Sequence, residues 1–292
     1  MISIFSPKNW KEYSLIDCGD FEKLERFGQF VLRRPEPQAI WKKALPEKDW
    51  NKLTDITFKS TSSHKGEWLT PKNFKEPWFV EYLLFDKKIK FKLRLTAFKH
   101  VGIFPEQADN WEFIYQRIKH IKKEVNQPKV LNLFAYTGGA SLAAKAAGAD
   151  VVHVDSVKQV VSWANENQQI SNLENIRWVV EDAMKFAERE ANRGNLYHGI
   201  ILDPPAYGIG AKGERWKLEE MIDPLLQTLS KILHPQHRFL VLNAYSLSFS
   251  SLIINNLIKS NFHNVHKIDI GELVLNAESG NVLPLGVIGR II

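Results

Sequence analysis

Three aspartates each follow a short apolar segment in the second half of this 292-residue sequence. Asp155 ends the segment VVHVD, Asp182 follows IRWVV, and Asp203 ends GIILD. Carboxylates can accept hydrogen bonds from hydroxyl and amino groups. If the apolar segments are neighbouring strands of one parallel sheet, the three carboxylates meet at one edge and can bind different parts of a single polar ligand.

The first of these carboxylates predicts a ribose contact. Asp155 follows Gly138 of the segment FAYTGGAS at a spacing typical of an acid that accepts the ribose hydroxyls, and the adjacent Ser156 is included in the same site. The two glycines of FAYTGGAS let a ligand lie against the backbone at a helix N-terminus. The segment lacks the third glycine of GxGxxG, which counts against a pyrophosphate-binding NAD site. The alternative role for Asp155 is to cap the following helix.

The second carboxylate predicts an adenine contact. Asp182 stands where a carboxylate can accept a hydrogen bond from an adenine amino group, and Ala183 offers a backbone amide to the ring. Capping the next helix is the alternative for Asp182, and the two roles can coexist. S-adenosylmethionine contains a ribose and an adenine but no pyrophosphate, so we expect it as the cofactor.

The third carboxylate begins a tripeptide, Asp203-Pro204-Pro205, that predicts the reacting end of the site. Asp203 can contact the cofactor and can also accept a hydrogen bond from a nitrogen that receives a methyl group. The two prolines fix the backbone and donate no backbone hydrogen bond, which leaves their carbonyls free to accept. Tyr207 can stack on a planar base turned out of its helix. We expect these four residues to be catalytic, mainly by aligning the reacting groups.

The elements that must position these residues alternate between strand and helix. Five apolar segments predict strands that are each followed by a helix, namely KVLNLF, VVHVD, IRWVV, GIILD and RFLVLN. Such alternation is typical of an α/β fold with a parallel sheet and right-handed crossovers, which binds ligands beyond the carboxyl ends of its strands. The segments VHKIDIGELVL and LGVIGRII predict a terminal β-hairpin. Asp109 is expected to cap a helix over 109–125 that joins this domain to the residues before it.

Residues 1–100 carry the basic charge of the chain. They contain 20 Lys and Arg against 13 Asp and Glu, a net charge of +7, whereas the remainder carries −1. Five of the nine tryptophans lie here as well. Because lysines neutralise phosphates and rings stack on bases, this composition favours an RNA partner. The alternative is a small domain with a tryptophan core and a solvated lysine-rich face.

The same residues predict a small, mainly β domain. The segment IKFKLRL alternates apolar and charged residues, as a half-exposed strand does, and FDKK before it predicts a hairpin turn. A short helix is expected within PEPQAIWKKALP, after its proline.

Composition restricts the class of protein further. The apolar segments are too short to cross a membrane, and the N-terminal residues lack the pattern of a signal peptide, so we expect a cytoplasmic protein without a membrane partner. The single cysteine, Cys18, excludes an internal disulfide and a cysteine-based zinc site. His234 and His237 have no third ligand near them in the sequence, so no metal site is expected.

The motifs resemble those of the class I S-adenosylmethionine-dependent methyltransferases, and more closely the branch that contains the large-subunit rRNA cytosine-C5 methyltransferase and its bacterial relatives. The resemblance covers roughly residues 78–292 and is carried by HVGIFPEQADNW, LNLFAYTGGASLAAKAAGA, HVDSVKQVVSWANEN, EDAMKF and DPPAYG. YSLIDCGDFEKLERFG also resembles the N-terminal segment of one bacterial subgroup. The fold that this implies is a Rossmann-like seven-stranded methyltransferase sheet whose last strand is antiparallel, over residues 101–292.

The resemblance also implies how the cofactor is held. The FPEQ segment would fold over it, with Phe104 and Gln107 lining the pocket, and Phe134, Tyr136 and Gly138 would lie beside the methionine portion. The residues alone would predict that GIFPEQ is a linker, which is the alternative.

The sequence departs from the cytosine enzymes at one position that matters for the reaction. Carbon 5 of cytosine becomes nucleophilic only after a thiolate adds at carbon 6. The cytosine enzymes carry this cysteine after the fifth strand, where the present chain has Tyr245 or Ser246. We therefore expect a methyltransferase that acts on an rRNA base without a cysteine-dependent C5 mechanism. A small-molecule or protein substrate, or an inactive RNA-binding relative, are the alternatives.

Overall fold

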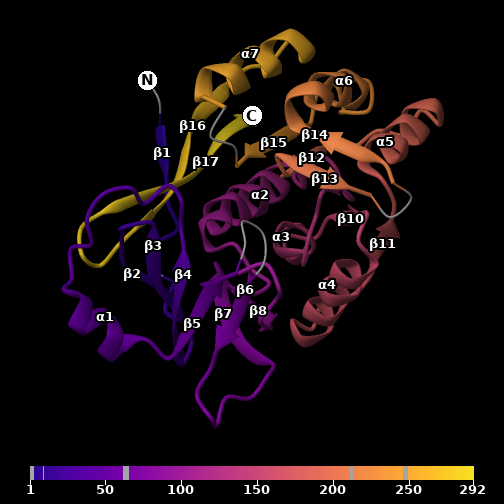
Figure 1. Ribbon diagram of the computed structural model, residues 1–292. Helices are drawn as coiled ribbons and strands as arrows, with labels where there is room; N and C mark the ends of the chain where they lie inside the picture. Colours follow the sequence, from indigo (N-terminus) through magenta and orange to yellow (C-terminus); the bar gives the residue numbers. More distant parts are fainter. Residues whose placement is uncertain (1–2, 9, 62–65, 211–212, 246–248) are drawn as a thin grey trace. The chain divides into compact units, whose positions relative to one another are not determined.

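The computed structural model describes residues 3–8, 10–61, 66–210, 213–245 and 249–292 (Figure 1). The chain divides into two compact units. The first comprises Met1–Phe5, Gln107–Leu273 and Gly286–Ile292, and the second comprises Ser6–Glu106 and Val274–Leu285. These units differ from the division expected at residue 100, chiefly because a segment near the C-terminus belongs to the second unit. The domains 1–100 and 101–292 as such stay a prediction.

The first unit contains a mainly parallel sheet with the strand order β1-β16-β17-β15-β12-β9-β10-β11. Its strands are β1 (Ser3–Phe5), β9 (Lys129–Leu133), β10 (Asp150–Asp155), β11 (Ile176–Val180), β12 (Gly199–Leu202), β15 (Phe239–Ala244), β16 (Ile268–Asn276) and β17 (Val282–Ile291). The last strand, β17, runs antiparallel to β15. The predicted α/β fold with an antiparallel last strand is therefore confirmed.

The sheet has eight strands rather than the seven expected. The additional strand, β1, pairs in parallel with β16. Gly271 permits this pairing, because a Cβ at that position would lie 1.9 Å from the carbonyl oxygen of Ser3. Three residues are too short a segment for a period-two pattern to identify from the sequence.

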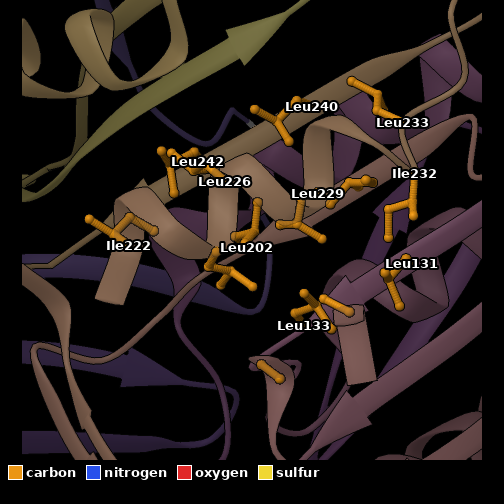
Figure 2. Close-up of a cluster of buried hydrophobic side chains, with 14 of the residues drawn as sticks. Leu131, Leu133, Leu202, Ile222, Leu226, Leu229, Ile232, Leu233, Leu240 and Leu242 are labelled. Carbon is orange, nitrogen blue, oxygen red and sulfur yellow. The ribbon is translucent and has the colours of Figure 1, made fainter. Parts of the chain in front are cut away.

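Six helices flank the sheet in the first unit: α2 (Ala108–Ile121), α3 (Gly139–Ala146), α4 (Lys158–Ile170), α5 (Ala183–Asn192), α6 (Leu218–Ser230) and α7 (Ser251–Asn261). Helices α5, α6 and α7 cover one face of the sheet, and α2, α3 and α4 lie on the other (Figure 1). Figure 2 shows leucines of β9, β12 and β15 packed against the apolar stripe of α6. Burial of these side chains fixes the strands whose ends carry the polar motifs. No helix of the described residues is long and apolar enough to cross a bilayer.

The helix expected over 109–125 is present as α2, but Asp109 does not cap it. The helix begins one residue earlier, with Gln107 as its N-cap, and makes no side-chain cap bond there. The Asp109 carboxylate instead accepts a hydrogen bond from Arg290 of β17. The carboxylate that was expected to cap the helix therefore forms an ion pair with Arg290 instead.

The second unit is mainly β, as predicted. A five-stranded sheet has the order β2-β3-β4-β5-β6, and β7 pairs antiparallel with β8 in a separate hairpin. The strands are β2 (Tyr13–Gly19), β3 (Glu22–Phe27), β4 (Phe30–Pro35), β5 (Ile56–Ser60), β6 (Gly66–Leu69), β7 (Trp78–Leu84) and β8 (Lys87–Leu93). The register joins Leu84 to Lys87, so the turn predicted at FDKK is confirmed.

The structure describes every residue of PEPQAIWKKALP, and none of them is helical. The helix α1 (Glu47–Leu53) begins after Pro46 instead. The buried carboxylate of Asp17 explains the difference, because it accepts hydrogen bonds from the backbone amides of Ala44 and Leu45 and so holds this segment in a non-helical conformation. Asp17 also accepts a hydrogen bond from Ser279, which lies on the C-terminal segment that completes the unit.

Candidate functional site

The predicted polar residues gather at one edge of the sheet in the first unit. Parallel pairing brings Leu133 level with Val154 and Leu202, and Leu202 level with Leu242. The residues that follow these positions therefore stand in a row at the carboxyl ends of β10, β9, β12 and β15. They are Asp155, Phe134, Asp203 and Asn243.

The loop between β9 and α3 adopts a backbone that ordinary side chains rarely take. Phe134 and Tyr136 have φ angles of 53° and 48°, and Gly138 has a φ of 92°. Asn167 of α4 donates to the carbonyl oxygen of Thr137 at 2.9 Å and holds the loop in place. Non-glycine residues with left-handed φ angles are strained, and such strain tends to be found at functional sites.

The two glycines of this loop serve packing within the protein. A Cβ on Gly138 would lie 3.1 Å from the Cβ of Ala164, and one on Gly139 would lie 2.6 Å from Cζ2 of Trp111. The missing side chains thus let α3 approach α4 and α2, whereas the sequence interpretation assigned both glycines to ligand approach. Contact between Gly138 and the cofactor stays a prediction.

Asp155 presents its carboxylate beside this loop. Its Oδ2 accepts from the backbone amide of Tyr136 at 3.0 Å, and its Oδ1 accepts from the amide of Val157 at 2.9 Å. Burial raises the pKa of Asp155, and the backbone donors, including that of Ser156, oppose the rise. Helix α4 begins at Lys158 with Val157 as its N-cap, so Asp155 does not occupy the cap position considered as its alternative. Each oxygen retains a further lone pair for a hydroxyl donor.

Asp182 occupies the cap position considered as its alternative. It is the N-cap of α5 and accepts a hydrogen bond from the backbone amide of Lys185 at 3.0 Å. Ala183, the first residue of α5, is buried. The carboxylate keeps free lone pairs, so capping and adenine recognition remain compatible, and the adenine role stays a prediction.

Asp203 is held by two side-chain amides. Gln107 donates through Nε2 to its Oδ2 at 3.1 Å, and Asn243 donates through Nδ2 to its Oδ1 at 2.6 Å. Burial raises the pKa of Asp203 to about 6, and the hydrogen bond from Asn243 acts in the opposite direction. The carboxylate is thus fixed in orientation and titrates close to neutrality, as groups at functional sites often do.

A chain of hydrogen bonds extends from Asp203 to Arg290 of β17. The Oε1 of Gln107 accepts from Asn110 at 2.7 Å, and Asn110 accepts from Nε of Arg290 at 3.0 Å. Arg290, in β17, is almost fully buried and also pairs with Asp109. The orientation of Gln107, which the resemblance placed at the cofactor, is therefore set by residues of α2 and β17.

The residues after Asp203 form a small ribbon. Strand β13 (Tyr207–Ile209) pairs antiparallel with β14 (Arg215–Lys217). The indole of Trp216 donates to the carbonyl of Pro205 at 2.7 Å and lies against Phe134, with ring centroids 4.7 Å apart. Pro204 is buried, whereas Tyr207 is 59% exposed. The aromatic ring is therefore free to meet a planar partner.

Several expected residues lie outside this cluster. Phe104 belongs to the second unit, where its ring contacts that of His100. Cys18 is also in the second unit and is fully buried, and burial raises the pKa of its thiol to about 11. Tyr245 is 41% exposed after β15. Ser246, named with Tyr245 at the position of the missing cysteine, lies outside the described residues.

The described residues contain no group of three His, Cys, Asp or Glu side chains that could hold a metal ion. The rings of His198, His234 and His237 stack in sequence, with centroids 4.7 and 6.0 Å apart. Burial is the main cause that lowers the pKa of His198 to about 4, and the neighbouring His234 and His237 act in the same direction. These rings pack together at the opposite ends of β12 and β15 from Asp203.

The sequence interpretation missed Asn243, Asn110, Arg290 and Trp216. A signal was available for Asn243, because it is the only polar residue of RFLVLNA after the arginine and follows the same pattern as Asp203 one strand away. No spacing rule links Arg290 to Asn110, which lie 180 residues apart.

The chain belongs to the S-adenosylmethionine-dependent methyltransferase family, whose sequence pattern matches residues 54–265. The class that the fold and the row of strand-end carboxylates define is therefore a methyltransferase with S-adenosylmethionine as its cofactor.

Individual relatives resemble this chain to different extents. The S-adenosylmethionine-dependent methyltransferase from Agrobacterium tumefaciens is 38% identical and superposes with a TM-score of 0.90 over 99% of this chain and 93% of that chain. A protein named SMU.776, crystallised with S-adenosylhomocysteine (SAH), shares the fold at 18% identity, with a TM-score of 0.73 over 98% of this chain and 76% of that chain.

Curated relatives carry names that refer to RNA. Ribosomal RNA large subunit methyltransferase K/L from Pseudoalteromonas atlantica is 29% identical over 195 residues, which are 66% of this chain and 26% of that protein. The protein of the same name from Shewanella frigidimarina is 28% identical over 56% of this chain and 22% of its own length. The chain thus spans only about a quarter of the length of these relatives.

Proposed function

We propose that this methyltransferase modifies a base of ribosomal RNA at the carboxyl edge of its sheet. The observation that carries the proposal is the fixed Asp203 carboxylate, which stands in the same row as Asp155 and is followed in the chain by the exposed Tyr207. The names of the curated relatives support RNA as the substrate.

The residues present fit the cofactor. Asp155 would accept the ribose hydroxyls with its remaining lone pairs, since Tyr136 and Val157 already fix both of its oxygens. Asp182 and Ala183 would meet the adenine, and the strained Phe134–Tyr136 backbone would lie at the methionine end with Gly138. Ser156 and Gln107 would complete the contacts, and a cofactor contact of Phe104 stays a prediction. When bound, the cofactor supplies an electrophilic methyl group on a sulfonium.

Asp203 and the prolines would orient the acceptor. The carbonyls of Pro205 and Ala206 already accept hydrogen bonds from Trp216 and from the amide of Leu218, so the loop shape is fixed before a substrate arrives. Asp203 would accept a hydrogen bond from the acceptor base, and Tyr207 would stack on it. Positioning of this kind lowers the barrier without a covalent intermediate.

A cysteine nucleophile plays no part in the proposed reaction. The sole cysteine, Cys18, is inaccessible and its raised thiol pKa keeps it protonated at neutral pH. Methyl transfer to carbon 5 of a pyrimidine, which needs an accessible thiolate, is therefore not the reaction that we propose.

The β7–β8 hairpin of the second unit offers a surface for RNA. Its outward face alternates apolar and basic residues, because the register pairs Phe79 with Lys92 and Leu83 with Lys88. Phe79 and Leu83 are 49% and 61% exposed. One acid interrupts this face, Glu81, which pairs with Lys90 at 2.8 Å. Exposed rings between lysines are typical of surfaces that bind single-stranded nucleic acid.

Two measurements test the proposal. Titration calorimetry should show that the protein binds SAH, and mass spectrometry of rRNA nucleosides from a deletion strain should show one methylated nucleoside missing. If the protein binds SAH but the deletion strain lacks no methylated rRNA nucleoside, the substrate is a small molecule or a protein, or the protein is an inactive relative. Absence of SAH binding at millimolar ligand would remove the proposal altogether.

The hairpin surface has its own test. Replacing Lys88, Lys90 and Lys92 by alanine should weaken RNA binding and lower the slope of log Kd against log salt by about 2, the effect of losing three phosphate contacts to a single strand. The matched control replaces the exposed Lys123, Lys231 and Lys259 of the first unit and removes the same charge. Equal effects of the two triple variants would mean that only net charge matters.

A further inference from the structure

Asn243 carries a buried oxygen that has no partner. The side chain is 2% exposed, and its Nδ2 donates to Asp203 at 2.6 Å. Its Oδ1 accepts no hydrogen bond within the part of the chain that the structure describes. A buried acceptor without a donor costs about 1–3 kcal/mol, so an orphan of this kind calls for an explanation.

Gly286 leaves space next to this oxygen. It has a φ of 147°, and a Cβ on Gly286 would lie 3.5 Å from Oδ1 of Asn243 and 3.2 Å from the carbonyl oxygen of Ala244. A Cβ at position 286 would therefore be in van der Waals contact with the unpartnered oxygen, and the φ angle favours glycine there. Asn243 lies between β12 and β17, with Asp203 on the β12 side.

The groups around Asp203 are rich in acceptors. The amide hydrogens of Gln107 and Asn243 are directed at the carboxylate, and the remaining capacity consists of carboxylate lone pairs and the amide oxygen of Asn243. A ligand that satisfies this group must bring hydrogen-bond donors, either N–H or O–H. If the proposed function is correct, two ligands bring them: the amino group of the cofactor's methionine end and an amino or ring N–H group of the acceptor base.

We propose that Asn243 and Asp203 together form a two-acceptor site for an N–H donor of a bound ligand. The amide of Asn243 orients the carboxylate through Nδ2, and its Oδ1 accepts the ligand's hydrogen directly. This inference rests on the proposed function for the identity of the ligand, but the unpartnered oxygen is a property of the protein alone.

The test compares Asn243→Leu, which removes both the amide donor and the acceptor, with Asn243→Gln, which keeps both. Affinity for SAH is measured by calorimetry, and kcat and KM are measured with rRNA. Asn243→Leu should lose at least tenfold in one of these readouts, and Asn243→Gln should recover part of that loss. If the leucine variant fails to fold, as judged by circular dichroism, Asn243→Ala replaces it.

The two sources of the donor give different results. A role at the cofactor weakens SAH binding but leaves 5′-methylthioadenosine, which lacks the amino group, bound as by the wild type. A role at the base leaves SAH affinity unchanged and lowers kcat/KM on RNA.

Asn261 provides the control, because its Nδ2 donates to Asp223 at 2.8 Å in the same arrangement and Asn261→Leu breaks only that bond and one to Leu257. Unchanged SAH affinity and unchanged turnover in Asn243→Leu would overturn the proposal. The Oδ1 atom would then accept a hydrogen bond from a buried water. If the wild type proves inactive on RNA, the proposed substrate is wrong and the SAH measurement decides alone.

Discussion

Asp155 and Asp203 carry the same functional group in different surroundings, and this difference predicts different phenotypes. Asp155 is fixed by backbone amides, whereas Asp203 is fixed by side-chain amides. Asp155→Ala should weaken SAH binding by about 1–3 kcal/mol, the scale of hydrogen bonds lost to a buried charged group. Asp203→Ala should leave that affinity nearly intact and lower kcat. Calorimetry and single-turnover kinetics separate the two effects, and equal losses of affinity would show that the roles are misassigned.

The surroundings of Asp203 also predict a pH dependence. Burial raises its pKa to about 6 from an ordinary value of 3.8. Because the ionised form is the acceptor, kcat/KM should rise with pH to a plateau, with a midpoint near 6. Asn243→Leu removes a hydrogen bond that favours the ionised form, so the midpoint should move to higher pH. Asp203→Asn is the control, since its lower activity should not vary over this range. A wild-type midpoint near the ordinary value would mean that solvent reaches the carboxylate.

At the residue scale, the sequence identified the charged members of the site but not their partners. Asp155 and Asp203 are recognisable because each ends an apolar strand. The bonds from Gln107 and Asn243 to Asp203 depend on side-chain geometry across 96 and 40 residues of chain, which no local pattern encodes.

Helix α3 shows how one element depends on a close approach. A Cβ on Gly139 would lie 2.6 Å from the ring of Trp111 in α2. Gly139→Ala should therefore lower the free energy of unfolding by about 1–3 kcal/mol, the usual cost of overpacking a well-filled core. Urea denaturation measures this loss. Trp111→Leu in the same chain should recover part of it, because the atoms that clash are removed, whereas simple addition of the two losses would mean that the clash is not the cause.

At the element scale, the sequence predicted the repeating elements well and the irregular ones poorly. The five parallel strands, their helices and the β7–β8 hairpin follow from strong periodicity. Strand β1, the β13–β14 ribbon and the start of α1 were missed, because each is short or is set by a distant contact such as that of Asp17 with Leu45.

The second unit as a whole depends on a segment far away in the sequence. Asp17 is fully buried and accepts hydrogen bonds from Trp50 at 2.8 Å and from Ser279 at 2.7 Å. Although burial alone would raise its pKa, these hydrogen bonds lower it. Ser279→Ala should lower the free energy of unfolding by about 1.5–3 kcal/mol, the range for hydrogen bonds to charged groups.

Thermal unfolding at several pH values measures this loss. The difference between Ser279→Ala and the wild type should be largest near neutrality and should shrink as the pH falls through the lowered pKa of Asp17, because protonation removes the charge. A difference that does not change with pH would mean that Ser279 does not act through the carboxylate. The nearby exposed Glu278, replaced by alanine, serves as the control.

The bond between Asp17 and Ser279 spans 262 residues and has a consequence for biosynthesis. N-terminal domains generally fold first while a chain is being made. Here the strands β2 to β8 leave the ribosome before the segment that carries Ser279, so the buried carboxylate of β2 waits for a hydroxyl that is translated 262 residues later. The second unit is therefore completed only after most of the first unit has been translated.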